Sequence, residues 1–380
     1  MYVTRPLSMY RRDPSALSWP PEGPNSGILV IQDADAEPTC CFGLCPSDRV
    51  SDLPFPQNKK LKVVYTQNHG EHSHVDETRT LFIPVLNQPL SANQYYVISA
   101  KKRSEGKAYM SSKEEDIKTC LFCIPCVSDV KPQALDVHDI YQKFEVRHRN
   151  RGGFTAKSVA SNGIPPEFLR RKGWRVRTSS SGQFLLDEAT GLDQTVRAHL
   201  PDFNFPLSEK LSAPVTVGIW YVPFMFIKEG NIKEQITHSA YYQMTLEQQW
   251  EQIFACDNEP GKGGVVTVDT EMVEIAGKGQ ALNRKVIDGV IWFDTEGEEN
   301  CIGMSLEVVE RIKWEETRFG WVGDEGKVKV KTLEEFSGTQ KWRSFGCYVL
   351  VERFLLKRMN GSLVLTWSFR HTHHIKNKWE

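Results

Sequence analysis

Apolar and polar residues alternate along much of the second half of the chain, which is the pattern of half-buried β-strands. Residues 215–227 are rich in aromatic and β-branched side chains, and Pro223 restricts this segment to a sheet edge or a bulge. In residues 301–314 the apolar side chains fall on alternate positions, and only Glu310 interrupts that face. We therefore predict a strand in each of these two segments.

A long hairpin is predicted near the C-terminus. Residues 347–359 and 362–374 are both rich in apolar and β-branched side chains, and Asn360 and Gly361 lie between them. An Asn-Gly pair suits the positive φ angles of a type I′ turn. The sequence therefore indicates two antiparallel strands joined by a tight turn.

Helical patterns are few. The strongest covers residues 245–256, where Thr245 is a good N-cap, Gln248 completes a capping box and the apolar residues recur at helical spacing. Short helices are also predicted after Ser112, after Asp136 and after Pro166.

The predicted strands are joined by short, turn-rich segments, whereas a parallel sheet needs regular crossover helices. We therefore predict an α+β fold class, predominantly antiparallel β with a few short helices. Three parts are expected: an extended N-terminal arm (1–27), a cysteine-rich domain (28–150), and a mixed α+β domain ending in the long hairpin (151–380). The arm is rich in proline, which removes amide donors and favours extended backbone.

The cysteine-rich domain contains an internal duplication. ILVIQD, TCCFGLCPSD and LKVVYT (28–33, 39–48 and 61–66) are followed by QYYVIS, TCLFCIPCVSD and QKFEVRH (94–99, 119–129 and 142–148). Each copy has a strand, a Thr-Cys-x-Phe motif with further cysteine, a Ser-Asp pair and a second strand. Two such copies can form pseudo-symmetric halves of one sheet.

Six cysteines lie in these two copies: Cys40, Cys41, Cys45, Cys120, Cys123 and Cys126. The spacing of Cys120 and Cys123 is one that zinc sites use, and the first copy can supply the other ligands of a tetrahedral site. Free cysteine also packs as a small buried hydrophobe. Buried thiols are our first interpretation, a zinc site is the second, and S-acylation with attachment to a membrane is the third.

Two histidines extend the apolar face of the last predicted strand. Because side chains alternate in a strand, His371 and His373 share a face with Trp367 and Phe369. Such a pair can bind zinc or act with a carboxylate in acid–base catalysis. A hydrogen-bonded pair at the margin of the sheet is the simpler interpretation.

Composition and charge narrow the classes of function. The chain has 380 residues, and its 47 Lys and Arg nearly balance its 48 Asp and Glu, which disfavours a nucleic acid as partner. We find no apolar run long enough to span a bilayer and no secretory signal, so we expect a cytoplasmic or nuclear protein. Motifs for a P-loop, a nucleophile elbow and a dinucleotide-binding turn are all lacking.

Several long phrases resemble a plant-restricted family, catalogued as domain of unknown function 1262. They include GPNSGILVIQD, GIPPEFLRRKGW, VGIWYVPFMFIKEG, LEQQWEQIF and FGCYVLVERFLLKRMNGSLVLTWSFRHTHHIKNKWE. The resemblance extends over essentially the whole chain and implies a soluble plant protein with no established activity. Some members carry a label that likens them to an insecticidal crystal toxin, but this sequence shows no amphipathic pore-forming hairpin. The family defines no catalytic or binding residues to carry over.

These observations favour a non-enzymatic intracellular binding protein with an unidentified protein partner. The resemblance loosely implies a setting in plant stress or defence responses. One alternative is a hydrolase or metal-dependent enzyme with a site near His371 and His373. Another is a toxin-like or lectin-like β module that acts at membranes or glycans. No cofactor is predicted, with zinc as the candidate to test.

Overall fold

The computed structural model describes residues 1–40, 45–69, 72–120, 124–258, 264–273, 275–277, 280–281, 284–293, 302–321, 327–339 and 341–380. They belong to two compact units. Unit 1 contains Met1–Ala189 and Gly230–Tyr241, and unit 2 contains Thr190–Glu229 and Tyr242–Glu380. The boundary predicted after residue 150 therefore falls inside unit 1.

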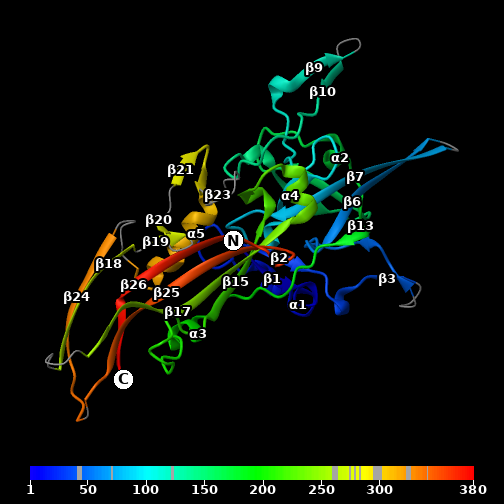
Figure 1. Cartoon of the computed structure of the whole chain (residues 1–380). Coiled ribbons are helices and arrows are strands. Elements are labelled where there is room, and N and C mark those ends of the chain that lie inside the picture. The colour runs from blue at the N-terminus through cyan, green and yellow to red at the C-terminus, as the bar shows by residue number, and fades with distance from the viewer. Residues whose placement is uncertain are drawn as a thin grey trace. The chain divides into compact units, whose positions relative to one another are not determined.

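The α+β prediction is wrong, because the protein is mostly β. Strands account for 48% of the chain and helices for 17%, and the helices are short (Figure 1). Among the described residues, no helix is both long and apolar enough to cross a membrane.

Unit 1 is built on a seven-stranded antiparallel sheet with the order β12-β11-β8-β7-β6-β13-β5. Its strands are β5 (Arg49–Val50), β6 (Lys59–His69), β7 (His72–Pro84), β8 (Gln94–Ser99), β11 (Lys143–His148), β12 (Phe154–Ser158) and β13 (Arg175–Gln183). The other elements of the unit are β1 (Tyr2–Pro6), β2 (Gly27–Ile31), β3 (Thr39–Cys40), β4 (Cys45–Pro46), β9 (Ile117–Cys120), β10 (Ile124–Val127), α1 (Leu7–Arg12), α2 (Glu167–Arg170) and α4 (Ile232–His238).

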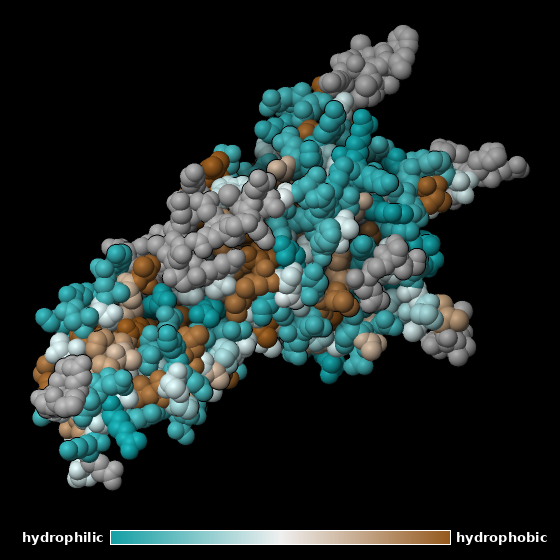
Figure 2. Space-filling model, viewed as in Figure 1, coloured by the Kyte–Doolittle hydropathy of each residue, from teal (hydrophilic) through white to brown (hydrophobic). Residues whose placement is uncertain are grey.

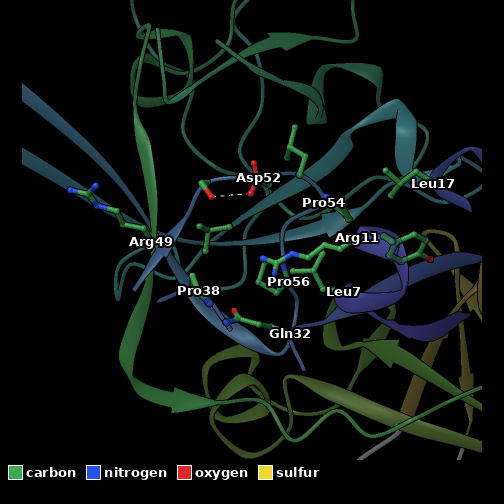
Figure 3. Close-up of a pocket in the computed structure, with 13 residues that line it drawn as sticks. Leu7, Arg11, Leu17, Gln32, Pro38, Arg49, Asp52, Pro54 and Pro56 are labelled. Carbon is green, nitrogen blue, oxygen red and sulfur yellow. Dashed lines mark hydrogen bonds between the residues drawn. The ribbon is translucent and has the colours of Figure 1, made fainter. Parts of the chain in front are cut away.

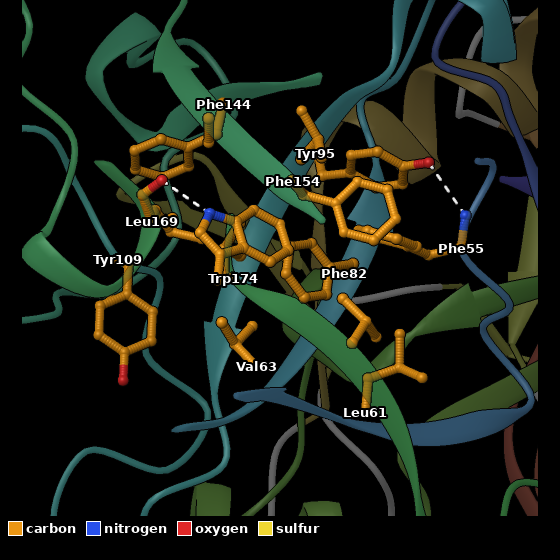
Figure 4. Close-up of a cluster of buried hydrophobic side chains, with 14 residues drawn as sticks. Phe55, Leu61, Val63, Phe82, Tyr95, Tyr109, Phe144, Phe154, Leu169 and Trp174 are labelled. Carbon is orange, nitrogen blue, oxygen red and sulfur yellow. Dashed lines mark hydrogen bonds between the residues drawn. The ribbon is translucent and has the colours of Figure 1, made fainter. Parts of the chain in front are cut away.

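An aromatic cluster forms the core of unit 1 (Figure 4). Trp174 is fully buried at its centre, and its indole N–H donates to the carbonyl of Leu169 at 2.9 Å. The ring of Phe154 lies 5.2 Å from that of Trp174, and Phe55 packs edge-on against Phe154 at 5.1 Å. Burial of several large rings around one indole is the main apolar contribution to the stability of this unit.

We predicted an extended arm for residues 1–27, but the N-terminal segment forms strands and short helices. Strand β1 pairs in parallel with β2, and the ring of Tyr2 is buried, with its hydroxyl donating to the carbonyl of Pro84 at 2.9 Å. Trp19, the tryptophan of this segment, is 59% exposed and does not hold it in place. The segment is held instead by the β1–β2 ladder, whose two strands lie on either side of the proline-rich stretch, with Pro6 the last residue of β1.

The two cysteine motifs form two short antiparallel hairpins, β3–β4 and β9–β10. Thr39 pairs with Pro46 in the first hairpin, and Thr119 pairs with Pro125 in the second, so the repeated sequence has a repeated local structure. Figure 1 shows the hairpins at separate places on unit 1.

Unit 2 contains three long strands that lie side by side in the order β17-β25-β26, with β15 beyond β17 and β19 and β20 beyond β26. The strands of this sheet are β14 (Gly191–Leu192), β15 (Val215–Pro223), β17 (Tyr241–Asp257), β19 (Ile275–Gly277), β20 (Gln280–Ala281), β25 (Ser344–Arg358) and β26 (Leu363–Trp379). The remaining elements are β16 (Ile227–Lys228), β18 (Val265–Val273), β21 (Arg284–Ile287), β22 (Val290–Phe293), β23 (Ile302–Ser305), β24 (Lys327–Glu335), α3 (Gln194–His199) and α5 (Leu306–Arg318).

The strongest predicted helix is a strand. Residues 245–256 lie in β17, which pairs with β25 along nearly its whole length. Gln248, interpreted as half of a capping box, instead donates its side-chain amide to Glu352 at 2.8 Å. The wide sheet buries both faces of β17, so its apolar residues do not alternate and the pattern is open to a helical interpretation.

The strand predicted over residues 301–314 is mostly a helix. Only β23 is extended, and α5 begins at Leu306. Its buried face contains Val308, Val309 and Ile312, followed by the fully buried pair Glu315 and Glu316. The buried face of α5 ends in two carboxylates and not in apolar residues. The apolar residues alone therefore do not show the helical spacing clearly.

The C-terminal hairpin is confirmed, with β25 and β26 pairing from Phe345↔Trp379 to Lys357↔Leu363. Gly361 has a φ of +83°, as predicted. Asn360 is outside the positive-φ region, so the turn is not type I′.

Strands β18 and β24 pair along their full length at one end of unit 2. One face contributes Val266, Val268 and Val330 to a buried cluster with Phe345. The other face is charged but includes exposed apolar residues such as Leu333, and Figure 2 shows hydrophobic patches among hydrophilic residues at this end.

Candidate functional site

His371, one of the two histidines singled out in the sequence, lies in a buried cluster of charged side chains in unit 2. Its imidazole has no solvent exposure. Its Nε2 lies 3.0 Å from Oε2 of Glu316 and 3.5 Å from Oε2 of Glu352. Both carboxylates are also fully buried.

Strand register and helix packing bring these groups together. Gln248 of β17 pairs with Glu352 of β25, which pairs in turn with Phe369 of β26, two residues before His371. Paired residues share a face, so Glu352 and His371 both point to the same side of the sheet. Helix α5 brings Glu316 to that side.

Arg197 of α3 completes the centre of the cluster. Its Nε donates to Oε1 of Glu352 at 2.8 Å, and its Nη2 donates to Oε2 of the same carboxylate. Its Nη1 donates to the main-chain carbonyl of Glu315 at 3.2 Å. The guanidinium also stacks on the ring of Phe319, with Cζ 4.3 Å from the ring centroid. This buried cation is therefore held by charge-assisted hydrogen bonds and by an aromatic ring.

Arg311 extends the cluster along α5, where its Nη2 donates to Oε1 of Glu315 at 2.5 Å. We call Arg197, Arg311, Glu315, Glu316, Glu352 and His371 the charge network. When all are ionised, its three cations match its three carboxylates. Such pairing is what allows so many charges to lie out of water.

Glu316 and His371 hold their protons more tightly than the same groups do in water, whereas Glu352 holds its proton less tightly. Burial, with the carboxylate of Glu352 nearby, raises the pKa of Glu316 to about 8. Burial opposes the charged form of His371, but hydrogen bonds with Glu316 and Glu352 raise its pKa to about 9. Burial also opposes ionisation of Glu352, yet hydrogen bonds from His371 and Arg197 lower its pKa to about 2.

Three side chains of the network are candidate metal ligands. Glu316, Glu352 and His371 each offer one atom, and these atoms lie within 4.8 Å of one another. Carboxylate and imidazole suit zinc and similar ions. Arg197, however, already bonds both oxygens of Glu352. A divalent ion would add charge to a cluster that its own arginines neutralise.

The network has no substrate-sized space of its own. A nearby pocket of about 160 Å³ is lined by Leu192, Gln194, Arg197, Ala198, Arg318 and Phe319. Its lining includes neither His371 nor a glutamate of the network. Acid–base catalysis needs the reacting group within hydrogen-bond reach of the base. This geometry therefore favours a structural role for the network.

His373 is separated from His371 by an irregularity in β26. His371 pairs with Leu350 and Ile375 pairs with Val349, so three residues of β26 bulge out between two consecutive residues of β25. His373 lies in this bulge and is exposed, although its ring centroid is still 5.4 Å from that of His371. The two imidazoles therefore do not form one buried face, contrary to the prediction.

The predicted cysteine site lies partly outside the described residues. Cys41 and Cys123 fall outside them, and Cys120 and Cys126 are placed only as backbone in β9 and β10. Cys40 and Cys45 are free and exposed, so the buried-thiol interpretation is wrong for these two residues. Zinc binding and S-acylation stay predictions.

Unit 1 contains a second candidate, a pocket beside α1 with a volume of about 120 Å³ (Figure 3). We call it the proline-lined pocket. Its lining comprises Leu7, Tyr10, Arg11, Leu17, Gln32, Pro38, Arg49, Val50, Ser51, Asp52, Leu53, Pro54 and Pro56. Seven of the thirteen lining residues are leucine, valine or proline. Proline rings are rigid, so the apolar wall that they form loses little conformational entropy when a ligand binds.

Six of the thirteen residues that line the proline-lined pocket carry polar groups: Tyr10, Arg11, Gln32, Arg49, Ser51 and Asp52. Figure 3 shows Arg11 reaching across the pocket while Arg49 points away from it. Arg11 has no ion-pair partner in the part of the chain that the structure describes. Asp52 accepts a hydrogen bond from the Ser51 hydroxyl at 2.9 Å. Burial raises the pKa of Tyr10 to about 12, so its phenol is neutral at ordinary pH.

Sequence reasoning found His371 but missed its partners. Glu315 and Glu316 look like any adjacent carboxylates, and Arg197 and Glu352 are ordinary surface residue types. The available signal is helical spacing, since Val308, Ile312, Glu315 and Glu316 share one face of a helix. For Glu352, the signal is one acid within a long apolar strand.

Comparison with known proteins gives a family match to part of the chain and a likeness in fold. Residues 22–123, all in unit 1, match the model of a family described as "Protein of unknown function (DUF1262)". No curated protein matches the chain. Among solved structures, the crystal structure of Cry35Ab1 is similar, with a TM-score of 0.50 and 13% identity over 86% of this chain and 90% of that one. At this identity the likeness shows a shared β-rich fold.

Proposed function

We propose that this protein is a non-enzymatic binding protein that takes a short segment of a partner protein in the proline-lined pocket. One observation carries the proposal. The side chain of Arg11 extends across a pocket whose walls are largely apolar, and its guanidinium has no ion-pair partner among the described residues. The charge network supports the non-enzymatic part, because the described acid–base cluster is enclosed in protein. We assign that network to stability.

The size of the pocket favours a side chain over a free metabolite. Pockets that enclose whole small molecules usually have volumes of roughly 300–1,000 Å³. A pocket of about 120 Å³ has room for one aliphatic or aromatic side chain. A peptide can insert one such side chain into the pocket as its anchor, while its other residues contact the rim. The anchor then acts as a hot-spot residue, which supplies most of the binding energy.

The charge of the pocket sets the second requirement on the ligand. Arg11 offers a planar set of donors that matches a carboxylate. Asp52 at the rim repels a second acid, so one negative group is favoured over a run of them. The proposed ligand is therefore a peptide with one apolar residue next to a single Asp or Glu.

The test uses labelled peptides of this pattern and fluorescence anisotropy with the full chain. Arg11→Glu should weaken binding by at least ~10-fold, because it removes the cation and adds repulsion. Arg12→Glu is the matched control, since Arg12 makes the same charge change but bonds Ser8 instead. The proposal fails if no peptide of the pattern binds, or if both variants weaken binding equally.

A toxin-like or lectin-like β module is the second candidate. It is supported by the fold likeness to Cry35Ab1 alone. Binding to liposomes or to a glycan array would favour it. If the full chain binds neither, while the peptides bind, the second candidate is removed.

A further inference from the structure

Cys40 and Cys45 lie directly opposite each other across the β3–β4 hairpin, where they are Cα partners. Both are free thiols and both are exposed. The four residues between them, 41–44, lie outside the described part of the chain. Two exposed cysteines in register on neighbouring strands are a specific arrangement, unlike a single surface cysteine.

The hydrogen bonding of the hairpin defines their spacing. The amide of Ser47 donates to the carbonyl of Pro38 at 2.7 Å, so Pro38 and Ser47 are a hydrogen-bonded pair. Bonded and non-bonded pairs alternate along an antiparallel ladder, which makes Cys40 and Cys45 a bonded pair too. Cα atoms in such a pair are about 5.5 Å apart. Disulfides most often join Cα atoms about 5.5–6 Å apart. Their Cβ atoms are about 3.8 Å apart, closer than in an open bonded pair, so closing the bond must draw the two hairpin strands together at this position.

The surroundings of the thiols also suit reaction. The Cys40 Sγ contacts the carbonyl of Pro46 at 3.9 Å, and the pair is otherwise open to solvent. Cys347 is the contrasting case in unit 2, because it is fully buried and burial raises its pKa to about 12. An oxidant in solution therefore meets the hairpin thiols and not Cys347.

From this geometry we propose that Cys40 and Cys45 are a site of reversible oxidation that forms a cross-strand disulfide. The oxidant is a low-molecular-weight disulfide such as oxidised glutathione. One hairpin thiolate attacks a sulfur of the oxidant, forms a mixed disulfide and releases one small thiol. The second hairpin thiolate then attacks the protein sulfur and releases the other small thiol. Two protein thiols are oxidised, one small disulfide is reduced, and the thiol protons pass to the released thiols.

This site does not depend on the proposed peptide-binding function. The proposed chemistry takes place on the hairpin itself, and its test needs no peptide. Loss of peptide binding by the pocket would leave it intact.

The test incubates the full chain with oxidised glutathione and maps the thiols by mass spectrometry. Trypsin cleavage after Arg12 and Arg49 places Cys40, Cys41 and Cys45 in one peptide, apart from the cysteines of the second hairpin. We expect that peptide to lose the mass of two hydrogen atoms and to regain it with dithiothreitol. Cys41→Ser should keep this change, because Cys40 is the register partner of Cys45.

Cys40→Ser and Cys45→Ser should each abolish the internal disulfide and accumulate a glutathione adduct on the thiol that is left. Retention of the disulfide in Cys40→Ser would assign it to Cys41 and overturn the proposal. Glutathione adducts alone in the unmodified sequence would overturn it as well.

Discussion

The imidazole Nε2 of His371 lies 3.0 Å from Oε2 of Glu316, and neither side chain is exposed. This contact joins the last strand of the chain to helix α5, 55 residues earlier. Arg197 and Glu352 surround it with further charge-assisted bonds, so helix and sheet in unit 2 are joined by ion pairs as well as by apolar packing.

Replacing Arg197 by methionine should strongly destabilise unit 2. The carboxylate of Glu352 would stay buried without its bidentate partner, which typically costs about 3–5 kcal/mol. Urea unfolding followed by tryptophan fluorescence measures the loss. Arg318→Met is the control, because Arg318 is 35% exposed and its contact with Glu315 is 3.9 Å long, so its loss should cost less than ~1 kcal/mol. Equal losses in the two variants would contradict a structural role for the network.

The stability of the protein should fall as the pH rises from about 6.5 to about 9. The pKa of His371 is raised from 6.5 to about 9 in the folded state, so folding binds a proton that the unfolded chain releases in this window. The stabilisation is complete below pH 6.5 and lost above pH 9, with a size on the order of 3 kcal/mol. The raised pKa of Glu316 has the same sign.

Unfolding free energies measured from pH 6 to pH 9.5 check this dependence. His371→Gln should be less stable at pH 6 and show a flatter profile, since glutamine does not titrate. His373→Gln is the control and should keep the slope, because burial lowers the pKa of His373. A slope that His371→Gln leaves unchanged would refute the assignment.

We expect that a metal ion does not stabilise the charge network and that the network does not need one to form. A ligand that binds only the folded state raises its melting temperature. Because Arg197 already bonds Glu352, zinc added to the purified protein should leave the melting temperature unchanged, and so should a chelator. Differential scanning fluorimetry measures both. A rise with zinc that His371→Gln abolishes would instead identify a metal site.

Replacing Trp367 by alanine should open a cavity in unit 2. The indole is buried and packs 5.6 Å from the ring of Phe293 and 5.2 Å from that of Phe369. Its removal should cost about 3–5 kcal/mol. Trp19→Ala removes the same side chain from an exposed position and should shift the unfolding free energy by less than ~1 kcal/mol. A small effect at Trp367 would show that this face is not a packed core.

Local sequence was sufficient for elements whose signals extend over only a few neighbouring residues. The C-terminal hairpin could be predicted, and so could the first part of the aromatic segment at 215–227, which forms β15 as far as Pro223, because alternation and turn residues act over a few positions. Residues 224–226 of that segment form a short helical turn instead. His371 stood out for the same reason, as the polar end of an apolar face.

Tertiary structure decided the secondary structure of elements that bury charged side chains or that are buried on both faces. Residues 245–256 are a strand because β25 covers one edge along its length, and residues 306–318 are a helix because the sheet supplies partners for Glu316. Arg197 and Glu352 are 155 residues apart in the chain. A charged side chain is stable in a core only when its counter-charge is present there, and the pairing of such distant groups depends on how helices and strands pack. The sequence alone therefore determined the extended, antiparallel character of the chain, and packing alone decided which charges lie inside it.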